Sequence, residues 1–161
     1  MQKERNNLST RYKWSSLNGL QKGTYGEYFA KMEFAMHGFS VYTSEVDDHG
    51  VDFVAQHGRG GFYEVQVKTV TGNNLVYVNE DKFKKTNRFL VALVRLTEGE
   101  PPEFYLFRGS DWDKSTGLLV YNPYEGKKSA PAFEIHLSAS REPALVEYAF
   151  DRVVRSLIGD A

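Results

Sequence analysis

Apolar residues at helical spacing predict a helix over residues 24–37 that ends at Gly38. One apolar stripe of this helix consists of Tyr25, Phe29, Met32 and Met36. A second stripe consists of Ala30 and Phe34, and Glu27 lies in line with it at helical spacing. The pattern therefore places one carboxylate on a helix face that otherwise carries predicted core residues.

Short segments rich in β-branched and aromatic residues follow, and turn residues separate them. Residues 39–44, 51–56 and 62–70 are predicted as strands, with turns at 47–50 and in the glycine-rich stretch 58–61. Because side chains alternate along a strand, the third strand has two different faces. One face carries Tyr63, Val65, Val67 and Thr69, and the other carries Glu64, Gln66 and Lys68.

Further strands are predicted over residues 75–78, 89–96, 103–107, 118–121 and 133–137. A final helix is predicted from about residue 140 to Gly159, and its core face consists of Leu145, Val146, Ala149, Phe150, Val153 and Leu157. The order of helix, strands and helix predicts an α/β (α+β) fold, in which an N-terminal and a C-terminal helix flank a central mixed β-sheet. Residues 1–21 show no clear periodicity and are predicted as a polar N-terminal arm, and residues 22–161 as a single domain.

Composition excludes several classes of protein. The 161 residues include no cysteine, which rules out disulfides, thiolate metal sites and cysteine nucleophiles. No stretch approaches the roughly 20 apolar residues of a membrane span, and the first ten residues lack the apolar core of a secretory signal. We therefore expect a cytoplasmic protein without a membrane partner.

The net charge of −1 does not by itself indicate a nucleic-acid-binding protein. The distribution is more informative, because an acidic segment, residues 23–67, lies between basic segments 1–22 and 68–95. This order is compatible with a metal-binding pocket beside surfaces that contact phosphates. The alternative is chance clustering of solvated charges.

Polar side chains on two neighbouring predicted strands carry the candidate chemistry. Asp52 lies on one strand of the predicted hairpin, and Gln66 and Lys68 share a face of the other, roughly 6.6 Å apart along the strand. A charged side chain that points into a core is costly unless it is paired or binds a metal. The alternative is a half-exposed strand with a solvated polar face, as in a structural or interaction protein.

The order of these residues resembles that of the PD-(D/E)XK nuclease superfamily. In that family a Glu on a helix precedes an Asp on a strand, and an acidic residue or Gln, one spacer residue and a Lys follow later. The matching residues are Gly26-Glu27, Gly38-Phe39, Gly50-Val51-Asp52 and Gln66-Val67-Lys68. The resemblance covers residues 22–96 and implies a restriction-endonuclease-like core. One departure is Gln66, where the commonest family motif has Glu or Asp. A neutral oxygen there leaves less negative charge to hold a cation, although Glu64 on the same face could restore some of it.

The resemblance also implies roles for these residues. Mg²⁺, or Mn²⁺, would be held by Asp52, the Gln66 side-chain oxygen and the Val67 backbone carbonyl, with Glu27 reaching it directly or through a water. Lys68 would position or help to deprotonate the attacking water and stabilise charge on the phosphate. The implied reaction is in-line hydrolysis of a phosphodiester without a covalent intermediate.

The leading hypothesis is a metal-dependent endonuclease from a restriction, repair or mobile-element system. Its expected partner is nucleic acid, DNA rather than RNA, and a homodimer is one assembly to consider. A cluster after the motif strand consists of Lys82, Lys84, Lys85 and Arg88, and these residues either contact phosphates or form a solvated helix face. The alternative function is a nuclease-fold module that binds nucleic acid or a protein partner without cutting.

Overall fold

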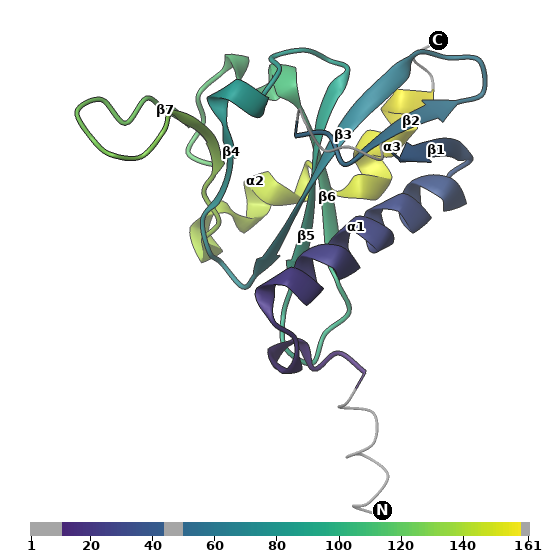
Figure 1. Cartoon of the computed structure of the whole chain (residues 1–161), viewed down its shortest axis with the longest axis horizontal. Helices are drawn as coiled ribbons and strands as arrows, with labels where there is room; N and C mark the ends of the chain where they lie inside the picture. Colours follow the sequence, from purple (N-terminus) through teal and green to yellow (C-terminus); the bar gives the residue numbers. More distant parts are fainter. Residues whose placement is uncertain (1–10, 44–49, 159–161) are drawn as a thin grey trace, which may run out of the picture.

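A five-stranded mixed sheet organises the computed structural model, which describes residues 11–43 and 50–158. Its strand order is β1 (Phe39–Thr43), β2 (Phe53–His57), β3 (Phe62–Thr71), β5 (Phe89–Leu96) and β6 (Glu103–Arg108). The β3–β5 pair is parallel, and the other neighbours are antiparallel. Helix α1 (Gly19–Met36) lies across one face of this sheet (Figure 1). The predicted mixed sheet with an N-terminal helix is therefore confirmed.

Helix α1 begins at Gly19, five residues before the predicted start. The reason is a capping box, in which the Asn18 side chain accepts from the Gln21 N–H and the Gln21 side chain accepts from the Asn18 N–H. Before it, Trp14 in the 3-10 helix η2 (Trp14–Ser16) is buried and donates its indole N–H to the Glu100 carbonyl at 3.0 Å. Of the predicted polar arm, residues 14–16 therefore form η2 and residues 19–21 begin α1, and residues 1–10 lie outside the described residues.

The first hydrophobic core lies between α1 and the main sheet. Ala30 and Phe34 of the second predicted stripe are fully buried there. The first stripe is only half in the core, because Met32 and Met36 are 58% and 78% exposed. At Gly26 the helix touches β3, since a Cβ on this residue would lie 1.8 Å from the Thr69 hydroxyl oxygen. Only a glycine lets the helix approach the strand this closely.

A second sheet was not predicted. It consists of β4 (Val76–Asn79), β8 (Ala132–Ile135) and β7 (Leu119–Asn122) in that order, with both pairs antiparallel. The second sheet encloses a second core with the face of the main sheet opposite α1. Strand β5 is buried along its whole length and separates the two cores, with Leu90 and Ala92 on the α1 side and Val91 and Leu93 on the other.

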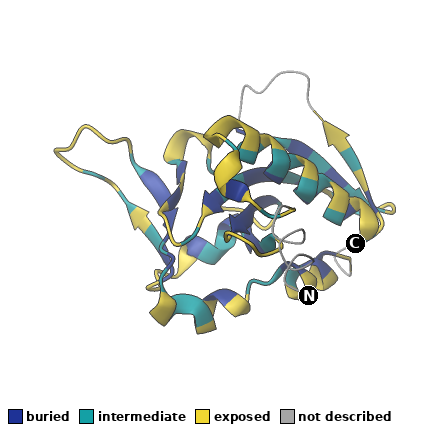
Figure 2. Cartoon of the chain, turned by 90° about the horizontal axis from the view of Figure 1, so that it is seen from below, coloured by how far each residue is buried: buried dark blue, intermediate teal, exposed yellow. Residues whose placement is uncertain are grey.

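The predicted C-terminal helix is divided into two. After η5 (Ala139–Arg141), helix α2 (Glu142–Val146) ends before helix α3 (Phe150–Ile158) begins. Between them Ala149 forms a β-bridge with Tyr105, and Tyr148 accepts the Leu106 N–H through its carbonyl at 2.8 Å. The single-helix prediction is thus wrong. Figure 2 shows the alternation of buried and exposed positions in the fold, and Val146, expected in the core, is 45% exposed.

One charged side chain is buried in the main sheet. The guanidinium of Arg95 on β5 donates to the carboxylates of Glu103 and Glu142 and to the hydroxyl of Tyr105. These carboxylates raise the pKa of Arg95, and hydrogen bonds from Arg95 hold the pKa of Glu103 below its ordinary value. Burial raises the pKa of Tyr105 to about 12. The network compensates the cost of burying the guanidinium charge.

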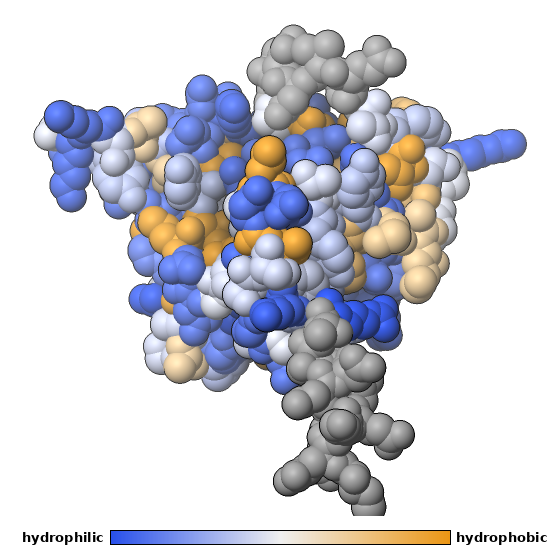
Figure 3. All heavy atoms as spheres, turned by 60° about the horizontal axis from the view of Figure 1, so that its bottom comes forward, coloured by the Kyte–Doolittle hydropathy of each residue, from blue (hydrophilic) through white to orange (hydrophobic). Residues whose placement is uncertain are grey.

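Within the described ranges, no helix is long and apolar enough to cross a membrane. The face shown in Figure 3 is mainly hydrophilic, with separate hydrophobic patches between the polar side chains. Scattered apolar residues of this kind are ordinary on folded domains.

Candidate active site

Asp52 directly precedes β2, at the end where β2 begins to pair with β3. The Asp52 N–H donates to the Val65 carbonyl at 2.9 Å. The Asp52 carboxylate then accepts the Val67 N–H at 2.6 Å, in the place where a backbone acceptor would continue the ladder. Because the N–H and C=O of one strand residue point to the same edge, the Val67 carbonyl also lies on the Asp52 side. The site therefore begins beside the Gln66–Val67 peptide.

The amide oxygen of Gln66 is buried in this region. The residue is 8% exposed, and its Oε1 accepts no hydrogen bond within the described residues. Gly50 passes close to it, since a Cβ there would lie 3.2 Å from this oxygen and 2.8 Å from the Lys82 Cβ. Gly50 also has a φ of +71°, a conformation that favours glycine. The Gln66 oxygen thus lies next to Gly50, and Lys82 packs against the same glycine.

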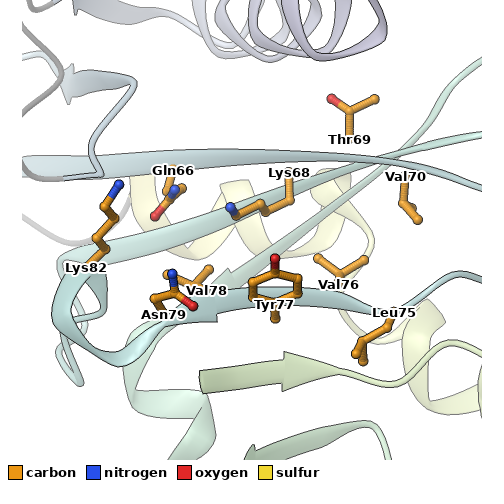
Figure 4. A pocket seen from close by; sticks show the side chains of 10 residues that line it. All are labelled: Gln66, Lys68, Thr69, Val70, Leu75, Val76, Tyr77, Val78, Asn79 and Lys82. Carbon is orange, nitrogen blue, oxygen red and sulfur yellow. The ribbon is translucent and has the colours of Figure 1, made fainter. Parts of the chain in front are cut away.

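Lys68 lies beyond Gln66 on the same strand. Both side chains line a groove of about 320 Å³ between β3 and β4. In Figure 4 they extend from β3 towards β4, and the Tyr77 hydroxyl is directed back towards β3. The Lys68 Nζ lies 6.0 Å from the centroid of the Tyr77 ring. The groove therefore has a cationic wall on β3 and an aromatic wall on β4.

Glu27 approaches from the helix. It follows Gly26, the residue at which α1 touches Thr69 on β3, and it is partly exposed. The structure gives Glu27 no hydrogen bond or ion pair with another described residue. Asp52 thus lies directly before β2, beside the stretch of β3 that carries Gln66 and Lys68. Glu27 belongs to α1, which packs on the Val65 and Val67 face of β3, opposite the face that carries Gln66 and Lys68.

Acidic groups are sparse around this site. Over residues 11–43 and 50–158, no group of three or more His, Cys, Asp or Glu side chains could hold a metal ion. With Gln66 at the motif position, oxygen ligands would have to include an amide and a backbone carbonyl, both of which hard cations accept.

Comparisons with known proteins identify the fold. No family model matches the sequence, and no curated protein matches it. Among solved structures, the bacterial homing endonuclease I-Ssp6803I is similar with a TM-score of 0.51 at 17% sequence identity, over 88% of this chain and 92% of that one. The Holliday junction resolvase Hjc of Archaeoglobus fulgidus has a TM-score of 0.48 at 17% identity, over 76% of this chain and 88% of that one.

The chain has a restriction-endonuclease-like fold. The predicted resemblance is thereby confirmed for the fold. In this restriction-endonuclease-like fold, the Gln66-Val67-Lys68 stretch lies on β3, next to the strand that follows Asp52.

The basic cluster predicted after the motif strand does not act as one surface of the restriction-endonuclease-like fold. Between β4 and β5, helical structure is limited to η3 (Glu80–Lys82), so the expectation of a solvated helix face is wrong. Lys84 pairs with both carboxylate oxygens of Glu64 at 2.7–2.8 Å, and Lys85 pairs with Asp113 at 3.2 Å. The Arg88 guanidinium stacks on the Tyr63 ring at 4.7 Å. Of these four basic residues, Lys82 alone lines the groove.

The pairing of Glu64 with Lys84 also bears on the metal site. Glu64 was expected to add negative charge beside Gln66, but its carboxylate is neutralised by a lysine from the loop after η3. Asp52 and Glu27 therefore remain as the acidic residues that could bind a metal ion in this site.

Sequence reasoning missed Tyr77 and Asn79, which line the groove from β4. The alternation of residues 75–79 could have placed Tyr77 on the face opposite the buried Val76 and Val78. The sequence carries no signal that this face would lie across a groove from Lys68, because β4 belongs to the second sheet.

Proposed function

We propose that the chain is a divalent-metal-dependent endonuclease that hydrolyses phosphodiester bonds of DNA. The observation that carries the proposal is the buried amide oxygen of Gln66, which has no hydrogen-bond partner among the described residues and belongs to the residue before Val67, whose N–H binds the Asp52 carboxylate. A buried polar atom without a partner costs about 1–3 kcal/mol. Such a cost is explained when the oxygen serves as a ligand for a cation.

The donor set fits Mg²⁺ or Mn²⁺. The Asp52 carboxylate, the Gln66 amide oxygen and the Val67 carbonyl would hold the ion, and Glu27 would supply a second negative charge. When bound, the ion supplies Lewis-acid polarisation of the phosphate and lowers the pKa of a bound water. The hydrogen bond from the Val67 N–H holds the Asp52 carboxylate in one orientation. A carboxylate has several acceptor positions, so this bond is compatible with metal binding by the same group.

Lys68 would act on the substrate itself. Its ammonium group lies in the groove, where it can donate hydrogen bonds to a phosphate oxygen and to the attacking water. A positive charge at that position stabilises the negative charge that develops during in-line attack. Lys82 lines the same groove, and in Figure 4 it lies on the other side of Gln66 from Lys68. It would bind the phosphate next to the one that Lys68 contacts.

The proposal is tested with supercoiled plasmid incubated with the protein in Mg²⁺, in Mn²⁺ and in EDTA. We expect nicking with either metal and none in EDTA. Lys68→Ala and Asp52→Asn should each remove most of the activity, whereas Lys114→Ala, an exposed lysine in another part of the fold, should not. Cleavage by Lys68→Ala at the parental rate would contradict the proposed site.

A second candidate function is a nucleic-acid-binding module that does not cut. The neutral Gln66 and the sparse acidic groups around it favour this alternative. DNA binding that is unaffected by metals, together with intact plasmid under all three conditions, would support it.

A homodimer would present one copy of the site to each strand of a duplex, so we also propose a homodimer as the cutting form. Sedimentation of the protein with and without duplex DNA tests this assembly.

A further inference from the structure

A pocket of about 400 Å³ lies on the outer face of the second sheet. It is lined by Leu75, Tyr77, Asn79, Tyr124, Ser129, Ala130 and Ala132. Three of these residues, Leu75, Tyr77 and Asn79, also line the groove beside Lys68 (Figure 4). Leu75 and the outward side chains of β4 therefore form a shared wall between this pocket and the candidate active site.

The structure holds the Tyr124 ring in an unusual way. Among the described residues, Tyr124 is the only non-glycine residue with a positive φ, 49°. Its hydroxyl donates to the carboxylate of Glu134, which is 1% exposed and also contacts the His136 Nε2 at 2.6 Å. A bulky residue in the left-handed region costs free energy and persists where surrounding contacts impose it, often at functional sites. The hydrogen bond thus fixes an aromatic ring as one side of the pocket.

The pocket combines groups that suit a flat, polar-edged ligand. Tyr77 and Tyr124 supply aromatic faces, and the Asn79 amide supplies both a donor and an acceptor. The Asn79 side chain forms no capping bond to η3, so it is not engaged by the helix that it precedes. The volume lies within the roughly 300–1,000 Å³ range of small-molecule sites.

Positive charge flanks the pocket. The loop between β7 and β8 projects from the body of the protein (Figure 1) and carries Lys127 and Lys128. The Lys127 Nζ lies 5.9 Å from the centroid of the Tyr124 ring. Lysines beside aromatic rings are typical of surfaces that bind the backbone of a single strand while its bases stack.

We propose that this pocket binds one unpaired nucleobase of the DNA strand whose phosphate lies in the Lys68 groove. The inference rests on the proposed function and specifies the substrate class, which is DNA with an unpaired base beside the scissile phosphate. The base stacks against Tyr124 and Tyr77, Asn79 forms hydrogen bonds with its edge, and Lys127 and Lys128 contact the flanking phosphates.

The test is a binding assay on the full chain in EDTA, so that no cleavage occurs. Two duplexes of the same length are compared, one with a single bulged 2-aminopurine and one with that base paired to thymine. We expect tighter binding of the bulged duplex and quenching of its 2-aminopurine fluorescence. Tyr124→Gly removes the ring and suits the positive φ, and Tyr77→Leu removes the second ring. Each should weaken binding of the bulged duplex roughly 5- to 150-fold, the loss expected for one base–aromatic stack.

Two control variants separate stacking from structural effects. Tyr124→Phe keeps the ring but loses the bond to Glu134 that holds it, and it should bind the bulged duplex more tightly than Tyr124→Gly and less tightly than the parent. Tyr28→Leu removes a tyrosine on α1 that is 63% exposed, and it should not change binding. Thermal unfolding of every variant confirms that it is folded.

The outcomes separate the two proposals. Equal affinity of the parent for both duplexes, or an equal loss for both in Tyr124→Gly, overturns the base pocket. If the parent still nicks plasmid in Mg²⁺, the proposed nuclease function stands without the pocket. A parent that neither binds these duplexes nor nicks plasmid refutes both.

Discussion

Replacing Gln66 by leucine should stabilise the metal-free protein while removing its response to metal. Leucine is similar in size to glutamine but has no oxygen, so it removes the buried Oε1 that has no hydrogen-bond partner among the described residues. The strand would keep its buried side chain at this position. This combination of higher stability and lost metal binding is expected only if the oxygen is a ligand.

The structure sets the size of both effects. Removing an unsatisfied buried polar atom recovers part of its desolvation cost of about 1–3 kcal/mol, so we expect the free energy of unfolding in EDTA to rise by about 1–2 kcal/mol. For a domain of this size that corresponds to about 2–8 °C in melting temperature. A metal at ten times its Kd should stabilise the parent by about 1.4 kcal/mol, or about 3–6 °C. Gln66→Leu should lose most of that shift.

Thermal and urea unfolding in EDTA and in Mg²⁺ measure these quantities. Gln56→Leu on β2 is the matched control, because the Gln56 amide already donates to the Gly60 carbonyl at 2.8 Å. This control should not become more stable, and it should keep the metal response. Gln66→Glu adds a negative charge and should bind metal more tightly than the parent. A Gln66→Leu protein that is less stable than the parent in EDTA, or that retains the full Mg²⁺ shift, would refute the reasoning.

Three further predictions concern the surrounding framework. Asp52→Asn should abolish most of the Mg²⁺-induced rise in melting temperature, and an unchanged rise in this variant would place the metal elsewhere. Gly26→Ala should destabilise the protein by about 1–3 kcal/mol in urea unfolding because its methyl group meets Thr69; Thr69→Ala should recover part of the loss, and additive effects would argue against this contact. Hydrogen bonds from Arg95 lower the pKa of Glu103, so Glu103 stabilises the fold above its ordinary value of 4.5 and this contribution is lost as the pH falls through the lowered value; melting between pH 7 and pH 3 should therefore decline less in Glu103→Gln, and identical pH profiles would contradict this.

Much of the main sheet could be predicted because its signals are local. The alternation along β3 correctly separates Val65 and Val67, which pack on the α1 side, from Gln66 and Lys68, which line the groove. The apolar run of β5 was predicted with its observed bounds, since a strand buried on both faces has no polar alternation. The Asn18–Gln21 capping box was also readable in the sequence and would have placed the start of α1 correctly.

Other features depend on contacts that no local pattern contains. The break between α2 and α3 follows from the bridge of Ala149 to Tyr105, which lies far away in sequence. For the candidate site, motif order predicted that Asp52 would lie beside the Gln66–Lys68 stretch, because both belong to one hairpin. The groove was not predictable, since its second wall belongs to a sheet whose strand partners the alternation of residues does not specify.

The two walls of the groove belong to two different sheets, which meet in the second hydrophobic core. Gln66 and Lys68 project from β3 in the main sheet, whereas Tyr77 belongs to the second sheet, which packs on the face of the main sheet opposite α1. Substitutions of Phe133 or Ile135, which pack in the second core, should therefore shift Tyr77 more than they disturb the bond between Asp52 and Val67. One wall of the groove thus belongs to a different hydrophobic core from the one that contains Val67.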